Sequence, residues 1–271
     1  MENKSNAIAS IGLAAMWLAA TTCWAQAPPP ASSTAASTAL QYLQPSAVPA
    51  PLRAPLVALG NRLQTPGEEK FTLTGTYTDG SGSQGIKITW QIPGQVRIDL
   101  TGATPLSISS DGATTASSAG AVTPANDDLI ETLGDDRAEA LLFGVSKPDF
   151  GWRFVGGWFR TDDGTTQNYT GPFYHIHQDN AAVKVRSDKA QRNKFFYFDS
   201  TTSLLAEVNY SVERNGAAVN ARTLYSGWTT VAGQAVPGQI VHSENGVAVI
   251  TIQISSGQAS AAANDSLFTT P

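Results

Sequence analysis

The sequence predicts a mainly β protein, with a curved antiparallel sheet of about eleven strands (an incomplete β-barrel) packed on one or two helices. Two observations indicate the sheet. Apolar and polar residues alternate from Ala206 to Glu213, which is the period of a half-buried strand. The dipeptides Asn215-Gly216 and Asn245-Gly246 accept positive φ angles and join such runs into hairpins. A third observation limits the helices, since only residues 127–143 form a convincing internal one.

Short turns separate the first predicted strands, so these strands should pair antiparallel. In the first of them, Phe71, Leu73, Gly75 and Tyr77 alternate with four threonines. A return strand is expected after Asp111-Gly112. The strands expected before the internal helix cover residues 71–78, 86–92, 96–101 and 106–110. Those expected after it cover 152–160, 174–178, 183–186, 195–199, 206–213, 220–225, 239–243 and 247–254.

Two helices are expected to cover part of this sheet. A short one should run from about Pro55 to Leu63 and end at Pro66-Gly67, because leucines recur there at helical spacing. The helix at 127–143 has acidic residues at its positive end and an apolar stripe, and Gly144 stops it. Residues on the apolar register should be mostly buried: Trp90, Ile98, Tyr210 and Ile252.

The N-terminus has the pattern of a signal peptide. Lys4 precedes an apolar run at residues 8–20, and small residues around Ala25 and Ala27 fit cleavage after either one. The alternative is a membrane-tethered lipoprotein acylated at Cys23, although Thr21-Thr22 makes a poor lipobox. We expect a signal peptide at 1–25, an Ala/Pro/Ser/Thr-rich linker at 26–51 and one domain at 52–271. The protein should therefore be exported, to the periplasm or beyond.

Composition excludes several partners and chemistries. Cleavage after Ala25 or Ala27 would leave no cysteine, hence no disulfide and no cysteine metal site. A formal net charge of −5, with 17 basic residues, argues against nucleic acid as a partner. No second long apolar run follows the N-terminal one, so no transmembrane segment is expected in the mature chain.

No catalytic motif is evident. Residues 80–85 satisfy G-x-G-x-x-G, but a strand follows them instead of the helix that a dinucleotide site needs. His175 and His177 would share one face of a strand and could hold zinc with a third ligand such as His242, yet a polar strand face is the simpler interpretation. The acid pairs, including Asp135-Asp136, are expected in turns or at a helix start. We expect no enzyme activity, no metal and no cofactor.

Aromatic residues cluster around Trp152–Phe159 and in Phe195–Phe198. The second run places aromatic side chains on both faces of one strand, so both faces need to be covered. An ordinary core explains this, and so does a cavity for an apolar ligand, because a cavity uses the same residue types.

Two stretches resemble the superfamily of periplasmic lipoprotein carriers, the LolA/LolB-like proteins. The first is 71–112, with Pro93-x-x-x-Arg97 opening a strand and Asp111-Gly112 in a later turn. The second runs from Tyr197-Phe198-Asp199 to the closing segment Asp265–Phe268. Order and spacing carry this resemblance, which covers most of residues 55–271.

The resemblance implies a half-barrel whose open side is plugged by helices, around an apolar cavity that carries lipid or lipidated protein without covalent chemistry. It also implies that Arg97 contacts the helical lid, although Arg97 lies on the strand face opposite Val96 and Ile98. An envelope sensor or protein-interaction module with the same fold and no lipid cargo is the alternative. Candidate residues lining the cavity are Trp90, Ile98, Phe154, Trp158 and Phe196.

Overall fold

The structure is a computed structural model. It describes residues 50–60, 69–91, 94–144, 152–155, 158–160, 166–168, 173–178, 194–264 and 266–271. Side chains are described for these residues except 50–51, 143–144 and 152–178. All the described residues belong to one compact unit. The predicted signal peptide (1–25) and the linker up to residue 49 lie outside the described residues.

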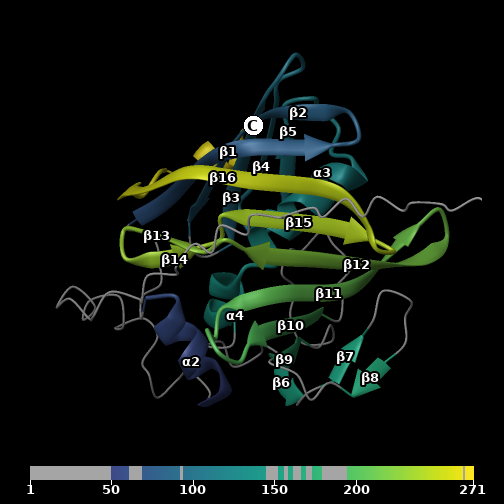
Figure 1. The fold of residues 1–271 in the computed structure, drawn as a ribbon. Coiled ribbons are helices and arrows are strands. Elements are labelled where there is room, and N and C mark those ends of the chain that lie inside the picture. The colour runs from purple at the N-terminus through teal and green to yellow at the C-terminus, as the bar shows by residue number, and fades with distance from the viewer. Residues whose placement is uncertain are drawn as a thin grey trace, which may run out of the picture. The chain divides into compact units, whose positions relative to one another are not determined.

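The main feature is a twelve-stranded antiparallel sheet with the strand order β5-β4-β3-β2-β1-β16-β15-β12-β11-β10-β9-β6 (Figure 1). Because β5 and β6 stand at the two ends of this order, the sheet is open. Pairing of β1 with β16 joins the first strands of the sheet to the last. The bounds are β1 (Glu69–Asp79), β2 (Gly82–Gln91), β3 (Gln95–Thr101), β4 (Leu106–Ser110), β5 (Thr115–Ser117), β6 (Trp152–Val155), β9 (Phe173–Gln178), β10 (Lys194–Asp199), β11 (Leu205–Arg214), β12 (Ala217–Ser226), β15 (Gln239–Glu244) and β16 (Val247–Ala261).

The predicted fold class, an open antiparallel sheet with helices, is therefore confirmed. Both Asn-Gly turns are as expected: Asn215 and Gly216 have φ angles of 54° and 78°, and Asn245 and Gly246 have 48° and 80°. Positive φ at both central positions matches the right-handed twist of the flanking strands.

Some strand predictions need correction. The expected strand 152–160 is two strands, β6 and β7 (Trp158–Arg160), and β7 pairs with β8 (Thr166–Asn168) in a separate hairpin. The segment around Val231 forms another hairpin, β13 (Thr229–Val231) with β14 (Gln234–Val236), because Ala232 and Gly233 both adopt positive φ. Residues 183–186 lie outside the described residues.

Strand β16 extends seven residues beyond the predicted end at Ile254. A register shift between Thr74 and Gly75 allows the polar stretch after Ile254 to keep pairing with β1. Gly75 is needed there, since a Cβ atom at this position would lie 2.0 Å from the Gln253 carbonyl oxygen. The polar residues after Ile254 suggested that the strand ends there. The bulge opposite Gly75 instead allows β16 to continue.

One face of the sheet is apolar and buried, and we call it the core face. The four residues predicted to be buried lie on it, with exposed fractions of 2% for Trp90, 0% for Ile98, 5% for Tyr210 and 0% for Ile252. Cross-strand pairs continue the core face from β2 and β3 to β10 and β11, where Phe196 pairs with Val208. The opposite, outer face carries the threonines of β1 and the charged pair Arg97 and Asp99 of β3.

The predicted helix at 127–143 is interrupted. Helix α3 (Pro124–Ile130) begins three residues early, because Thr123 and Asn126 form a capping box before it. A π-helical turn, η1 (Glu131–Asp135), follows, and α4 (Ala138–Gly144) completes the segment. Gly134 lies in the turn, and a Cβ there would come within 3.1 Å of Val96. Close packing on β3 thus accompanies the irregular turn.

The N-terminal helix is also displaced from its prediction. Helix α2 spans Ala50–Ala58 and contains Pro55, which the sequence argument placed at the beginning. Leu52 and Leu56 in the helix and Leu59 just after it are buried, so packing outweighs the missing backbone donor of proline. Gly60 ends the helix earlier than Pro66-Gly67, with a φ angle of 103°. No helix among the described residues is long and apolar enough to cross a membrane.

Candidate functional site

Residues 124–144 form a segment that we call the helical cover, since it packs on the core face. Its turn η1 contacts β3 and its helix α3 contacts β4. Leucines and isoleucine of the helical cover are buried with the core face: Leu129, Ile130, Leu133, Leu141 and Leu142. Between the same two layers lies a series of polar side chains, which the apolar pattern does not predict.

A small cavity of about 10 Å³ lies where the second half of the helical cover meets the sheet. This volume is that of about one water molecule. The lining is mostly apolar, with a few polar groups: Trp90, Leu133, Arg137, Ala138, Glu139, Leu205, Tyr225, Trp228, Pro237 and Ile240. As it stands, the cavity is closed to an acyl chain, which needs roughly 300 Å³ or more.

Arg137 is the cation of this cavity. Its side chain is buried, and the central guanidinium carbon lies 4.3 Å from the ring centroid of Trp90. The Nε atom donates a hydrogen bond to the Gly134 carbonyl at 3.0 Å, while Nη1 has no hydrogen-bond partner among the described residues. Burial lowers the pKa of Arg137, opposed by the carboxylates of Glu139 and Asp135.

A buried lysine joins the helical cover to β10. The Nζ atom of Lys194 donates to the Asp136 carboxylate and lies 2.8 Å from Glu131 Oε1. Burial alone would lower the pKa of Lys194, but these two carboxylates outweigh it and raise that pKa. Burial raises the pKa of Asp136 to about 7, opposed by Lys194 and reinforced by Glu131. Two buried acids therefore share one cation, which favours a retained proton on the acid pair near neutral pH.

Two further polar contacts hold the second half of the helical cover. The Tyr225 hydroxyl donates to the Asp136 carbonyl at 3.0 Å, and Gln234 Nε2 donates to Glu139 Oε1 at 2.7 Å. Burial raises the pKa of Tyr225 well above its usual value. Both bonds are buried, and they connect the helical cover to β12 and β14.

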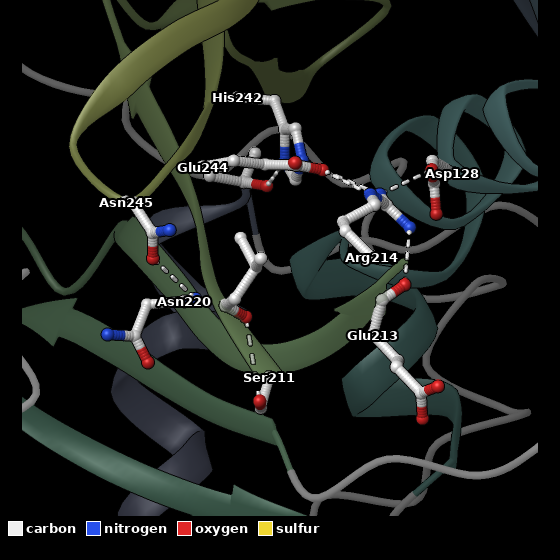
Figure 2. A network of polar contacts seen from close by, with 10 residues as sticks. Asp128, Ser211, Glu213, Arg214, Asn220, His242, Glu244 and Asn245 are labelled. Atoms are coloured by element: carbon white, nitrogen blue, oxygen red, sulfur yellow. Dashed lines mark hydrogen bonds and ion pairs between the residues drawn. The ribbon is translucent and has the colours of Figure 1, made fainter. Parts of the chain in front are cut away.

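A second ion-pair site lies at the start of the helical cover. Figure 2 shows Arg214, at the end of β11, between Asp128 of α3 and Glu244 of β15. Its Nη2 atom lies 2.6 Å from Asp128 Oδ2 and 2.5 Å from Glu244 Oε1. The arginine side chain is 28% exposed, so water screens this site more than the one at Lys194.

His242 lies on the core face near these charges. It is 2% exposed, and its Nδ1 atom is 3.0 Å from the Thr223 hydroxyl. Its ring stands 6.4 Å from that of Tyr210. Burial lowers the pKa of His242, so the neutral ring is favoured. The zinc hypothesis needed a third ligand, such as His242, beside His175 and His177. Backbone register pairs His175 with Tyr197 and His177 with Phe195, and because the side chains of the two histidines lie outside the described residues, the hypothesis stays a prediction.

The predicted cavity-lining residues separate into three groups. Trp90 lines the cavity. Ile98 and Phe196 lie on the same core face, fully buried, but not at the cavity. For Phe154 in β6 and Trp158 in β7, the side chains lie outside the description, and backbone register aligns Phe154 with Ile176. The assignment of these five residues to a ligand stays a prediction.

Arg97 contacts a helix other than the helical cover. Its Nη1 atom donates to the carbonyls of Leu267 and Thr270, at 3.3 Å and 2.8 Å, in and just after helix α5 (Ser266–Thr269). It also pairs with Asp99 at 2.9 Å on the outer face. Phe268 of α5 is 1% exposed and anchors that helix. The structure thus places Arg97 away from the cavity, as its alternation with Val96 and Ile98 indicated.

The polar residues that line the cavity or join the helical cover to the sheet were missed by sequence reasoning. The acid pair Asp135-Asp136 was expected in a turn exposed to solvent, but Asp136 is 0% exposed. The available signal was the charged run from Asp135 to Glu139 inside an otherwise apolar helix pattern. A lysine opening the aromatic strand at 194 was the corresponding signal in the sheet. Among the described residues, no group of His, Cys, Asp and Glu could hold a metal ion.

No family model and no curated protein matches this chain. Among solved structures, a DUF1329 family protein from Desulfovibrio piger is similar at 10% identity and a TM-score of 0.44, over 80% of this chain and 97% of that one. A LolA superfamily protein from Nitrosomonas europaea is similar at 8% identity and a TM-score of 0.45, over 80% of this chain and 96% of that one.

A structure of the MucA/MucB complex from Pseudomonas aeruginosa also shows a likeness, at 14% identity and a TM-score of 0.22, over 78% of this chain and 58% of that one. With identities of 8–14% and TM-scores of 0.22–0.45, these likenesses add nothing about activity to what the residues show.

Proposed function

We propose that the protein is an exported binding or carrier protein of the cell envelope, whose ligand is the acyl chain of a lipid or lipoprotein. The acyl chain enters between the helical cover and the core face. The protein acts by binding this chain, without covalent chemistry or a cofactor. The N-terminal segment serves as the export signal, with a tether through Cys23 as the alternative.

One observation carries this proposal: apolar surfaces meet beneath the helical cover, yet many of the contacts that fasten it are polar. When the cover lifts, water can replace these polar partners, and a typical hydrogen bond contributes only about 0.5–1.5 kcal/mol net. The partly exposed site at Arg214 contributes about 0–1 kcal/mol. When the buried ion pair at Lys194 opens, the low-dielectric attraction between its partners is lost, and hydration of the separated charges offsets much of that loss.

The apolar surfaces behave differently. Exposing them costs about 25 cal/mol for each Å² that water then covers. An acyl chain removes that cost, because each CH₂ group that it buries contributes about 0.8 kcal/mol. An open cover is therefore favoured when an apolar chain occupies the space, and a closed one, with its 10 Å³ cavity, in its absence.

A disulfide between the helical cover and the sheet tests the entry route. A Cβ built on Gly134 lies 3.6 Å from the Val96 Cβ, within the separation of about 3.5–4.5 Å that disulfides span. We would combine Gly134→Cys and Val96→Cys in the full chain carrying Cys23→Ser. Binding of a fluorescent fatty acid and of a fluorescent fatty acid methyl ester would be titrated before and after reduction.

The oxidised protein should bind neither probe, and reduction should restore binding. The single variants, treated identically, control for the cysteines themselves, and circular dichroism verifies the fold. Equal binding by the oxidised and reduced forms would place the ligand elsewhere. If the folded, reduced protein binds neither probe, the acyl proposal is wrong, and the protein-interaction alternative takes its place.

A further inference from the structure

Arg137 is a buried cation with an unused donor. Its side chain is 6% exposed, and one guanidinium nitrogen, Nη1, has no hydrogen-bond partner among the described residues. An unsatisfied buried donor costs free energy, more so on a charged group. A guanidinium presents its N–H groups in a planar fork that matches a carboxylate or a phosphate.

The other charges of the helical cover are largely occupied. Glu131 and Asp136 face Lys194, and Asp128 faces Arg214. Glu139, on the wall of the same cavity as Arg137, accepts the Gln234 side-chain amide at its Oε1 atom. Glu139 and Asp135 are thus the nearby carboxylates that would compete with an incoming anion for Arg137, and Glu139 is the one that lines the cavity.

Apolar walls surround the guanidinium. Trp90 lies against it, and Leu133, Leu205 and Ile240 line the same cavity. Tyr225 also lines the cavity, but its hydroxyl already donates a hydrogen bond to the Asp136 carbonyl. A single cation at the end of an apolar space has the chemistry to hold an amphiphile by both of its parts.

We propose that Arg137 selects, among acyl ligands, those with an anionic oxygen head group, a fatty-acid carboxylate or a lipid phosphate monoester. The head group accepts a hydrogen bond from Nη1 of the guanidinium, while the acyl chain runs along the core face. This inference rests on the proposed acyl binding, since the 10 Å³ cavity must widen as the helical cover lifts.

The test compares three ligands with the same twelve-carbon chain and different head groups: dodecanoic acid, its methyl ester and dodecyl phosphate. Each would displace a fluorescent fatty acid methyl ester from the full-length protein, and the total tryptophan emission, to which Trp90 and Trp228 contribute, gives a second signal. The unaltered protein should bind the acid and the phosphate at least tenfold more tightly than the ester. In Arg137→Gln the acid and the phosphate should bind no more tightly than the ester, so the preference is read as a ratio of affinities within the same variant.

Two variants keep the test decisive if Arg137→Gln folds poorly. Glu139→Gln retains a partner for Gln234, removes one of the two competing charges and should strengthen acid binding relative to ester binding. Arg137→Lys retains charge but loses the planar fork, and should bind the acid with intermediate affinity. A preference for acid over phosphate, or the reverse, identifies the head group.

Equal affinity for acid and ester in the unaltered protein would overturn the selectivity and leave acyl binding intact. So would a preference for the acid that survives in Arg137→Gln and is unaffected by Glu139→Gln. If none of the three ligands binds the protein, the proposed function itself is wrong, and the selectivity with it.

Discussion

The guanidinium of Arg137 stacks on the indole of Trp90, with 4.3 Å between the guanidinium carbon and the ring centroid. This contact joins the helical cover to strand β2, whose tryptophan is 2% exposed. A desolvated arginine over a tryptophan contributes about 2 kcal/mol. The pair therefore both fastens the cover and places a fluorescent reporter beside the candidate site.

Replacing Lys194 with methionine should destabilise the protein. The change leaves Glu131 and Asp136 buried without their cation, and removal of one partner from a buried ion pair costs about 3–5 kcal/mol. Protonation of Asp136 recovers part of that cost, so we expect about 3 kcal/mol. Urea unfolding measures it, with the exposed Lys87→Met as control, expected within about 0.5 kcal/mol of the unaltered protein. Equal midpoints for the two variants would contradict the ion-pair assignment.

The stability of the unaltered protein should contain a term that falls as pH rises. Burial raises the pKa of Asp136 to about 7 from 3.8, so the folded chain holds that proton more tightly than the unfolded chain. The resulting stability is complete below pH 3.8 and is lost as pH rises through about 7. Asp136→Asn removes the titration, and its stability should fall less over this window, by up to roughly 1 kcal/mol per pH unit.

His242 contributes to the pH dependence of stability with the sign opposite to that of Asp136. Its burial lowers its pKa below 6.5, so its contribution to stability is present above pH 6.5 and is lost as pH falls through the lowered value. In Asp136→Asn this loss on acidification should stand out. Hydrogen bonds lower the pKa values of Asp79 and Asp111 below 3.8, and these groups act below that window. Parallel curves of unfolding free energy for the variant and the unaltered protein would refute the Asp136 assignment.

Arg97→Ala should release helix α5 and leave the helical cover in place. The two carbonyls that Arg97 holds belong to Leu267 and Thr270. Because the site is partly exposed, we expect a global cost of about 1 kcal/mol or less. Amide hydrogen exchange should rise several-fold in residues 266–271 and stay unchanged in residues 124–144. Lys87→Ala, on the neighbouring strand, serves as control, and faster exchange in the helical cover would return Arg97 to a lid role.

Gly60→Ala should weaken the attachment of helix α2. Gly60 has a φ angle of 103°, and a Cβ there would lie 2.0 Å from the Gly233 carbonyl oxygen. Strain and clash together should cost roughly 1–3 kcal/mol in thermal or urea unfolding. Gly80→Ala is the matched change, since nothing lies within 4 Å of its Cβ position. A similar loss of stability in both variants would mean that the turn after α2 is not the constraint.

The alternation of residues and the turn dipeptides were sufficient to predict the sheet. Alternation at period two around Tyr210 and Ile98, with two Asn-Gly turns, specified strands, hairpins and the buried register, because these features are local. Arg97 could be assigned to the outer face for the same reason, since neighbours along a strand point to opposite sides. Local pattern also located the helical cover, although not its interruption at Gly134.

Which charged residues are buried depends on contacts that exist only in the folded protein. Asp136 and Lys194 are 58 residues apart, and no spacing rule relates them. Arg137 became the cation of a cavity because β2, β12 and β15 converge on it, each from a different part of the chain. Charged residues are ordinarily solvated, so sequence reasoning assigns them to the surface. Their burial depends on partners that folding brings together, and that pairing is a property of the three-dimensional arrangement.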